Sequence, residues 1–154
     1  MKLDHSEVGP SSVLHLLHRA GQCAEELFAI NVGRAEITPR QFAVLKAIAG
    51  GQDQSQTSLV ESTGIDRSTM ADIVHRLAAK SLIRRRRTRR DARMYAVSLT
   101  EKGHAALKLA EPAARSTDQR ILACLPQAQR EAFLRSLARI VGAIGAPGDP
   151  RGVR

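Results

Sequence analysis

The sequence is poor in aromatic residues, with no tryptophan, one tyrosine and three phenylalanines among its 154 residues. Hydrophobic residues nevertheless make up 43% of the chain, which is enough for a core and argues against wholesale disorder. Such a core has to be built from Leu, Ile, Val and Ala, a composition that suits packed helices. The length fits one domain of ordinary size.

The sequence also lacks the marks of export, membrane insertion and catalysis. Its first ten residues do not show the basic-then-apolar pattern of a signal peptide, and no apolar run approaches the ~18 residues of a membrane span. Cys23 and Cys124 are too few for a disulfide framework or a zinc motif. No glycine-rich phosphate loop, nucleophile elbow or recurring acidic pair is present. We therefore expect a cytoplasmic protein that is not an enzyme and needs no cofactor or metal.

Positive charge, in contrast, is abundant and concentrated in one segment. The formal net charge is +9 and the sequence pI is about 10.7. From Arg84 to Arg93, seven arginines stand against the single Asp91, so this segment contributes +6 of the total. A basic protein of this size is expected to bind a polyanion, nucleic acid first and an acidic membrane surface second. The local concentration indicates a binding site rather than a merely soluble surface.

Apolar residues recur at helical spacing at both ends of the chain. One helix is expected over residues 12–32, with Gly33 as its end, and another over residues 127–144. A further helix begins at the cap Thr100 and is expected to kink at Pro112. The side chains that the last helix should bury are Phe133, Leu134, Leu137, Ile140, Val141 and Ile144.

A capping box opens a shorter helix in the first half of the chain. Thr38 is the N-cap, Pro39 takes the first helical position and Gln41 the third. The helix should end at the glycines of residues 50–51. The side chains that it should bury are Phe42, Leu45 and Ile48.

Two short helices joined by a tight turn follow. Ser55 can cap the first, Gly64 breaks it, and Asp66 can cap the second, over residues 67–80. This is the helix-turn-helix pattern, in which the second helix reads DNA. Its buried stripe should be Met70, Ile73 or Val74, and Leu77.

The next segment has the pattern of a β-hairpin. Residues 81–83 lead into the arginine run, and residues 94–99 alternate in a strand-like way. The polar, turn-forming residues 88–92 are expected to form the tip. A hairpin with a strongly basic tip beside a helix-turn-helix is a wing.

Both ends of the chain supply helices with broad apolar stripes that one small winged domain cannot cover. A second copy would cover them, and a two-fold dimer would present two reader helices to DNA. We therefore expect a mainly helical fold with a small β-hairpin wing. Residues 37–103 form the winged helix-turn-helix domain, and residues 12–36 and 104–145 form a helical dimerisation region. Residues 1–11 and 146–154 are expected to be flexible.

With these elements in place, the chain resembles the MarR family of bacterial regulators over residues 13–144. The most specific match is Asp-Ala-Arg at residues 91–93 followed by residues 96–103, AVSLTEKG. These match the wing signature of the family, an Asp-x-Arg and then a strand ending in Leu-Thr-x-x-Gly. The further matches are Thr38-Pro39-x-Gln41-Phe42 and Gly64-Ile65-Asp66-x-Ser68-Thr69.

The resemblance implies a dimer whose first and last helices interlock, with a winged domain on each side. It also implies that Arg93 enters the minor groove of DNA and that Asp91 holds this arginine in place. Members of the family often carry Arg where this chain has Asp72, on the exposed face of the reader helix. A carboxylate repels phosphate but can accept a hydrogen bond from a cytosine amino group. We therefore expect an altered operator preference and not a loss of binding.

Candidate DNA contacts lie on the wing, on the reader helix and at the start of the preceding helix. Guanidinium groups neutralise phosphates and fit narrow minor grooves. Hydroxyls at a helix N-terminus can contact bases or phosphates, although simple capping is the other role open to Ser68 and Thr69. The candidates are Ser55, Gln56, Arg67, Ser68, Thr69, Asp72, His75, Arg76, Arg86, Arg87, Arg89, Arg90, Asp91 and Arg93.

The resemblance further implies a small-molecule effector bound between the dimerisation region and the winged domain. Candidate contacts come from the first two helices, and their basic character suggests an anionic effector. The chain is similar to the branch of the family that controls aromatic-acid catabolism, whose effectors are aromatic acids or their coenzyme A thioesters. The candidates are His15, His18, Arg19, Gln22, Arg40 and Phe42.

The histidines and cysteines have alternative roles. His15 and His18 are spaced for metal binding but have no evident third ligand, so a place in the effector pocket or on the surface is the other reading. The redox-sensing branch of the family uses a reactive cysteine in the first helix with tyrosines beside it, whereas the single tyrosine here, Tyr95, is in the wing. Cys23 is therefore expected to be a small core residue, and redox sensing through Cys23 is the alternative function.

The sequence thus predicts a transcriptional repressor that binds a pseudo-palindromic operator in double-stranded DNA as a homodimer. An anionic effector of the aromatic-acid or acyl-CoA type is expected to release it. A membrane-surface or RNA-binding protein is the other class that the basic run allows, but the predicted hairpin and reader helix argue against it.

Overall fold

The computed structural model describes residues 12–88 and 94–145. Its helices, in chain order, are α1 (Val13–Val32), a short 3-10 helix (Gly33–Ala35), α2 (Pro39–Ala49), α3 (Gln56–Thr63), α4 (Arg67–Ala79), α5 (Glu101–Ala123) and α6 (Gln127–Ile144). Its strands are β1 (Gln54–Ser55), β2 (Ile83–Arg87) and β3 (Tyr95–Leu99). These elements confirm the predicted fold class, mainly helical with a small β-hairpin.

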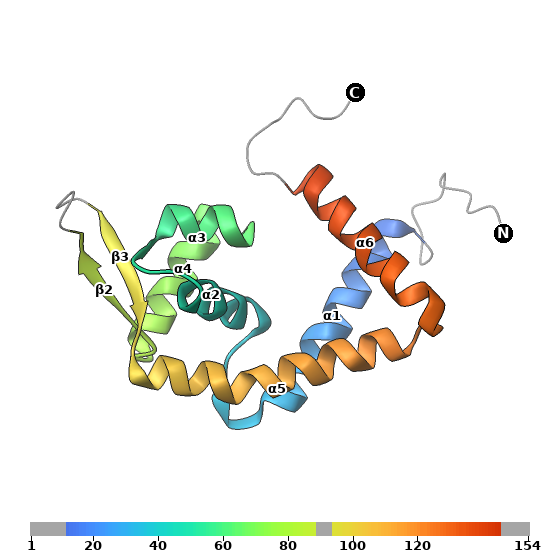
Figure 1. The fold of residues 1–154 in the computed structure, drawn as a ribbon, viewed down its shortest axis with the longest axis horizontal. Helices are drawn as coiled ribbons and strands as arrows, with labels where there is room; N and C mark the ends of the chain where they lie inside the picture. Colours follow the sequence, from blue (N-terminus) through green and yellow to red (C-terminus); the bar gives the residue numbers. More distant parts are fainter. Residues whose placement is uncertain (1–11, 89–93, 146–154) are drawn as a thin grey trace.

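The elements form two lobes joined by α5 (Figure 1). One lobe contains α2, α3, α4 and the β2–β3 hairpin, and the other contains α1 and α6. The helix α5 packs against α1 in one lobe and against α2 and β3 in the other. Asn31 of α1 donates a hydrogen bond to Thr117 of α5, at 3.4 Å, so the N-terminal helix is tied to the far half of α5.

The helix α5 is the longest described helix, with 23 residues, and it continues as one helix through Pro112. Its buried side chains, among them Leu107 and Ala110, recur at helical spacing. Neither α5 nor any other helix in the described part of the chain is long and apolar enough to cross a membrane.

Five helices begin at a side-chain cap whose oxygen accepts a hydrogen bond from the backbone N–H three residues later. At α2 the capping box is complete, because the Gln41 side chain also accepts from the backbone N–H of Thr38 at 3.1 Å. Hydrogen bonds from Thr69 hold the pKa of Asp66 below its ordinary value, so the ionised form that accepts them is favoured. The predicted caps Thr38, Ser55, Asp66 and Thr100 are confirmed, and Ser12 caps α1.

The hairpin belongs to a three-stranded antiparallel sheet with the order β1-β3-β2. In the hairpin Ile83 pairs with Leu99 and Arg87 pairs with Tyr95, so the four arginines of β2 alternate between the two faces. The strand β1, of only two residues, was not predicted from the sequence. Two polar residues show no alternation, and β1 is recognisable only through its pairing with β3.

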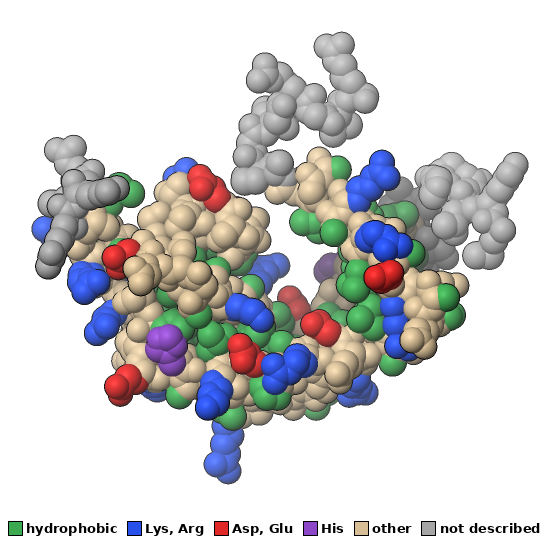
Figure 2. Space-filling model, viewed as in Figure 1, with side chains coloured by type: hydrophobic (Ala, Val, Ile, Leu, Met, Phe, Trp, Pro, Cys, Tyr) green, Lys and Arg blue, Asp and Glu red, His purple; other side chains and the backbone are tan. Residues whose placement is uncertain are grey.

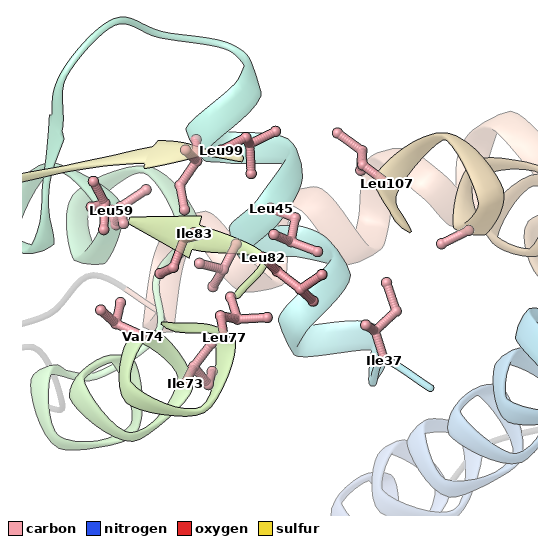
Figure 3. Packing of buried hydrophobic residues seen from close by; sticks show 14 of the residues in the cluster. Ile37, Leu45, Leu59, Ile73, Val74, Leu77, Leu82, Ile83, Leu99 and Leu107 are labelled. Atoms are coloured by element: carbon pink, nitrogen blue, oxygen red, sulfur yellow. The ribbon is translucent and has the colours of Figure 1, made fainter. Parts of the chain in front are cut away.

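A hydrophobic core fills the space between the helices and the hairpin of the winged lobe (Figure 3). Leu45 of α2, Leu59 of α3 and Leu77 of α4 are completely buried. Ile83 and Leu99, which pair across the hairpin, close the core on the side of the sheet. The stripe predicted for the reader helix is confirmed, with Met70, Ile73, Val74 and Leu77 all buried.

Phe42 differs from the expectation for α2, and the polar Gln41 beside it is buried. Phe42 is half-buried rather than buried, and its ring lies against Phe28 of α1 with centroids 5.8 Å apart. Gln41 is 7% exposed because its side chain folds back onto the cap. The prediction for Phe42 is wrong because helical spacing identifies an apolar face but not how far a neighbouring helix covers it.

The prediction that α6 buries its apolar stripe is wrong for the single chain. Leu134 is 50% exposed and Val141 66% exposed, and no residue of α6 is buried. The reason is that α6 makes only marginal contacts with the other described elements. Figure 2 shows hydrophobic side chains on the surface of this lobe. The exposed apolar residues of α1 and α6 are Val13, Leu14, Leu16, Leu17, Ile30, Leu134, Ile140, Val141 and Ile144.

Gly103 permits a close approach between α5 and the start of the wing. It is buried in the first turn of α5, and a side chain at this position would collide with the backbone carbonyl of Leu82. Just before it, the hydroxyl of Thr100 donates to the carbonyl oxygen of Ser81 at 2.6 Å. The Leu-Thr-x-x-Gly sequence therefore fastens α5 to the segment between α4 and β2.

Replacing Gly103 with Ala should lower the free energy of unfolding by roughly 1–3 kcal/mol, because the added methyl group pushes α5 away from Leu82. This loss should outweigh the gain of about 1 kcal/mol that Ala normally brings to a helix. Chemical denaturation followed by circular dichroism at one protein concentration measures the effect. As a control, Gly21→Ala in α1, where the new side chain meets no atom of the chain within 4 Å, should be stabilising by about 0.4–1 kcal/mol. Equal behaviour of the two variants would contradict the close approach.

Candidate nucleic-acid interface

The helix α4 presents a polar face to solvent. Gly64 ends α3 in a left-handed conformation, with φ of 70°, and Asp66 caps α4 two residues later. This tight turn brings α3 and α4 into contact, as the helix-turn-helix prediction requires. Opposite the buried stripe, helical spacing places Ser68, Asp72 and His75 on one exposed face, called the reading face below.

Further candidates lie along the two edges of the reading face. Thr69 and Arg76 are on the edge that turns towards α1 and α2, where both line a groove described below. Thr69 is half-buried and Arg76 is exposed. Arg67 is on the opposite edge, where it borders a hollow of about 80 Å³ with Gln56 at the start of α3.

Asp72 and Arg76 form an ion pair one helical turn apart. The Nε atom of Arg76 donates to Oδ2 of Asp72 at 2.9 Å. The side chain of Asp72 is 58% exposed and that of Arg76 is 65% exposed, so both remain accessible to a ligand. An exposed pair of this kind stabilises a helix by only about 0.3–0.5 kcal/mol.

Ser55 is committed to capping α3. Its Oγ accepts from the backbone N–H of Ser58 at 3.0 Å, and its backbone pairs with Ala96 of β3. Gln56 follows as the first residue of α3 and is half-buried. Contacts from these two residues to phosphate stay a prediction.

The arginines of β2 divide between the two faces of the hairpin. Arg84 donates from Nε to the hydroxyl of Ser98 at 3.3 Å, on the face away from the core. On the other face, the guanidinium of Arg87 lies over the ring of Tyr95, 5.8 Å from its centroid. All four arginines of residues 84–87 are exposed. The remaining predicted wing contacts Arg89, Arg90, Asp91 and Arg93 lie outside the described residues.

Asp53 restrains Arg86 in a way that the sequence analysis did not predict. Nη2 of Arg86 lies 3.4 Å from Oδ1 of Asp53, which precedes β1 and has a φ of 48°. Aspartate tolerates this left-handed conformation better than most residues do. The only signal in the sequence is an aspartate in a polar connector, and its arginine partner is 33 residues away.

The reading face and the strand β2, called the arginine strand below because it carries Arg84 to Arg87, lie in the same lobe. The helix α4 packs directly against β2, and Figure 2 shows Lys and Arg side chains along the edge of the molecule that carries the hairpin. Residues 84–87 are in a strand and not in a helix. The exposed arginines of β2 therefore lie in the lobe that carries the reading face.

A groove of about 650 Å³ separates α4 from α1 and α2. Phe28 of α1, Ile37 before α2 and Ile73 of α4 supply apolar surface. Its charged lining residues are Arg40 and Arg76, and the acidic Glu25, Glu36 and Asp72. The groove thus joins the reader helix to the helices that lead to the other lobe.

The structure gives the predicted effector contacts different places. Arg40 lines the groove, and Phe42 packs behind it against Phe28. His15, His18, Arg19 and Gln22 lie earlier on α1 and do not line it. Arg19 instead donates to Gln22 at 2.8 Å. Their role as ligand contacts stays a prediction, and the lining residues that the sequence analysis did not name include Glu25, Phe28, Glu36 and Ile37.

The two cysteines are exposed in the single chain. The expectation that Cys23 is a core residue is therefore wrong for the isolated chain, because the face of α1 that carries it is not covered. Among residues 12–88 and 94–145, no three His, Cys, Asp or Glu side chains gather as a metal site would require.

Comparisons with known proteins agree with this geometry. The sequence model of the MarR family matches residues 35–94. The HTH-type transcriptional repressor NicR of Pseudomonas putida is 32% identical to the chain over 127 residues, which are 82% of this chain and 80% of that protein.

Two solved regulators share the fold. The first is BpsR of Bordetella bronchiseptica, whose DNA binding is regulated by 6-hydroxynicotinic acid. It matches with a TM-score of 0.82 and 29% identity, and the match covers 89% of this chain and 98% of BpsR. The second is the transcriptional repressor CouR bound to a 23-mer DNA duplex, with a TM-score of 0.77 and 28% identity over 88% of this chain and 99% of that one. CouR has also been solved with p-coumaroyl-CoA bound.

Arg87→Ala should weaken binding to any duplex by a similar factor and reduce the log–log salt slope by about 0.9, because one phosphate contact is lost. Fluorescence anisotropy with a labelled duplex between ~50 and ~200 mM KCl measures both quantities. Lys108→Ala, which removes an exposed cation from α5, is the matched control and should leave the slope unchanged. The same loss of slope in both variants would mean that net charge alone matters.

Proposed function

Because the chain belongs to the MarR family of transcriptional regulators, we propose that it represses transcription by binding a pseudo-palindromic operator in double-stranded DNA as a homodimer. The family and the relatives named above are regulators, which confirms that the chain is not an enzyme. The observation that carries the proposal is the exposed reading face of α4 beside the arginine strand β2.

In this proposal each subunit lays α4 in a major groove. The arginines of residues 84–87 approach the flanking phosphates, and Arg93 enters the adjacent minor groove with Asp91 as its support. Phosphate contacts fix the position of the protein, whereas contacts from the reading face to base edges select the sequence. Half-sites lie one helical turn apart, ~34 Å, or a multiple of it, because the two-fold axis of the protein is copied into the operator.

The dimer is proposed to form through α1 and α6. Their exposed apolar side chains, such as Leu17, Ile140 and Val141, have no cover within the described chain. Contiguous apolar surface on a soluble protein marks an interaction site. A second copy related by a two-fold axis would bury both helices and leave both α4 helices exposed.

A small anionic effector of the aromatic-acid or acyl-CoA type is proposed to bind in the groove between α1, α2 and α4. The apolar lining suits an aromatic ring, and Arg40 has no carboxylate partner among the described residues. Arginine binds a carboxylate through two parallel hydrogen bonds. Two regulators that share the fold respond to or bind such compounds: the DNA binding of BpsR is regulated by 6-hydroxynicotinic acid, and CouR has been solved bound to p-coumaroyl-CoA.

The effector would act through the reader helix. Thr69, Ile73 and Arg76 of α4 border the same groove as Phe28 of α1, so a ligand in it touches both lobes. The ligand would bind more tightly to a dimer whose two reader helices are spaced too widely or too closely for DNA. The difference between its affinities for this state and for the DNA-binding state sets how far operator affinity falls. A coupling of about 1–3 kcal/mol corresponds to roughly a five- to 150-fold loss of affinity.

Ile140→Asp on the exposed face of α6 should convert the dimer into monomers and weaken operator binding, because it places a charge in the dimer contact. Arg93→Ala should weaken operator binding with the dimer intact. Sedimentation gives the oligomeric state, and gel shifts on the region upstream of the gene, with and without competitor DNA, give the affinity. If both variants bind as the wild type does, the proposed function is wrong.

Arg40→Ala should abolish the thermal stabilisation that aromatic acids give to the protein, because the carboxylate loses its partner. The probes are 6-hydroxynicotinate and benzoate, measured by thermal shift and by calorimetry. Arg19→Ala is the comparison variant, since Arg19 is an exposed arginine of α1 that was also predicted to contact the effector but lies outside the groove. A loss of stabilisation in Arg19→Ala alone would move the effector site towards the start of α1, and stabilisation only by cations or neutral compounds would contradict an anionic effector.

A further inference from the structure

We propose that Asp72 and Arg76 act as one reading unit, in which Arg76 donates to a guanine and Asp72 accepts from a cytosine within two adjacent base pairs of each half-site. The inference rests on the proposed function, because it requires α4 to enter the major groove. It goes further by assigning base preference to a particular pair of side chains and their hydrogen bond.

The ion pair leaves other hydrogen-bonding atoms of both side chains without a partner among the described residues. Arg76 uses Nε to reach Oδ2 of Asp72. Among the described residues, no group bonds to Nη1 or Nη2 of Arg76 or to Oδ1 of Asp72. Both side chains are more than half-exposed, so these atoms are open to a ligand that approaches the reading face.

The unused atoms match the edges of a G·C pair in the major groove. Guanine offers the acceptors O6 and N7, which suit the two Nη groups of an arginine, and cytosine offers the N4 amino donor, which suits a carboxylate oxygen. Because Asp72 holds the guanidinium, less side-chain freedom is lost when Arg76 binds guanine. The carboxylate thus positions Arg76 as well as contacting a base.

The alternative role for the pair is weak stabilisation of α4. The negative charge of Asp72 indicates that this role alone does not explain the residue. Asp72 is the sole acidic residue of α4, and it lies on the reading face that approaches a polyanion. A carboxylate there repels every phosphate backbone, and a base amino group within reach, of which the N4 group of cytosine is the usual partner of a carboxylate, offsets the repulsion. The carboxylate therefore raises specificity, because it weakens binding to sequences that offer it no amino group.

The experiment is a selection from a duplex pool with a randomised core, followed by anisotropy on the selected duplex and on one fixed arbitrary duplex. Asp72→Ala should bind the arbitrary duplex more tightly, with a steeper salt slope, and should lose its preference for cytosine at one position of each half-site by about fivefold or more. Arg76→Lys should lose the preference for guanine at the same or the adjacent position, because an ammonium group cannot form the fork.

Asp72→Asn gives the sharpest outcome, because an amide pairs with adenine N6 and N7 and should change the selected base from cytosine to adenine. Glu61→Gln, which removes an exposed carboxylate from α3, is the matched control for charge and should leave the selected sequence unchanged. Circular dichroism checks that α4 stays folded in each variant.

Two results would overturn the inference, and they are distinguishable. If the wild type enriches no sequence, the proposed function falls and the reading unit falls with it. If the wild type enriches a sequence and the Asp72 and Arg76 variants enrich the same one, the reading unit alone is wrong. In that case Asp72 only repels DNA, as Glu61 would.

Discussion

Three successive backbone carbonyls hold the reader helix, the wing and α5 together. Thr100 donates from its backbone N–H to Leu82 and from its hydroxyl to Ser81, at 3.1 and 2.6 Å, and the Lys102 ammonium donates to Lys80 at 3.0 Å. The chain reverses at Ser81, which has a φ of 60°, between the end of α4 and the start of β2. The angles among α4, the hairpin and α5 are therefore set at one point. The start of α5 is thereby joined directly to the segment that links α4 to β2.

This junction explains how the two lobes can communicate. The helix α5 starts at the junction and packs against α1 in the other lobe, while the groove lined by α1, α2 and α4 lies between. Dense packing transmits a displacement instead of absorbing it. In the proposed dimer, a ligand that changes how α1 lies against α4 would move the reader helix relative to the contact formed by α1 and α6. The separation of two reader helices in a dimer is then the quantity that such a ligand alters.

Features encoded by neighbouring residues were predictable from the sequence, and features that depend on distant partners were not. The cap at Asp66, the turn at Gly64 and the hairpin are local, because caps, left-handed turns and alternation involve residues close in the chain. The bond between Asp53 and Arg86 joins residues far apart in sequence, and periodicity cannot reveal it. The apolar stripe of α6 was read correctly as a stripe, but the single chain supplies nothing to cover it. The sequence pattern implied a second copy of the chain that would cover this stripe, and a single chain cannot show it.

The distribution of charge separates affinity from sequence selection. The wing carries most of the net positive charge, and arginine contacts to phosphate are nearly independent of sequence. A protein built only in this way would bind any DNA. The reading face is different, because Ser68, Asp72 and His75 offer hydroxyl, carboxylate and imidazole groups in place of a further basic row. A carboxylate among these groups costs affinity on every duplex, and the arginines of the wing can offset that cost. In the proposed complex with DNA, strong and unspecific attraction from β2 would allow α4 to carry a carboxylate that disfavours most sequences.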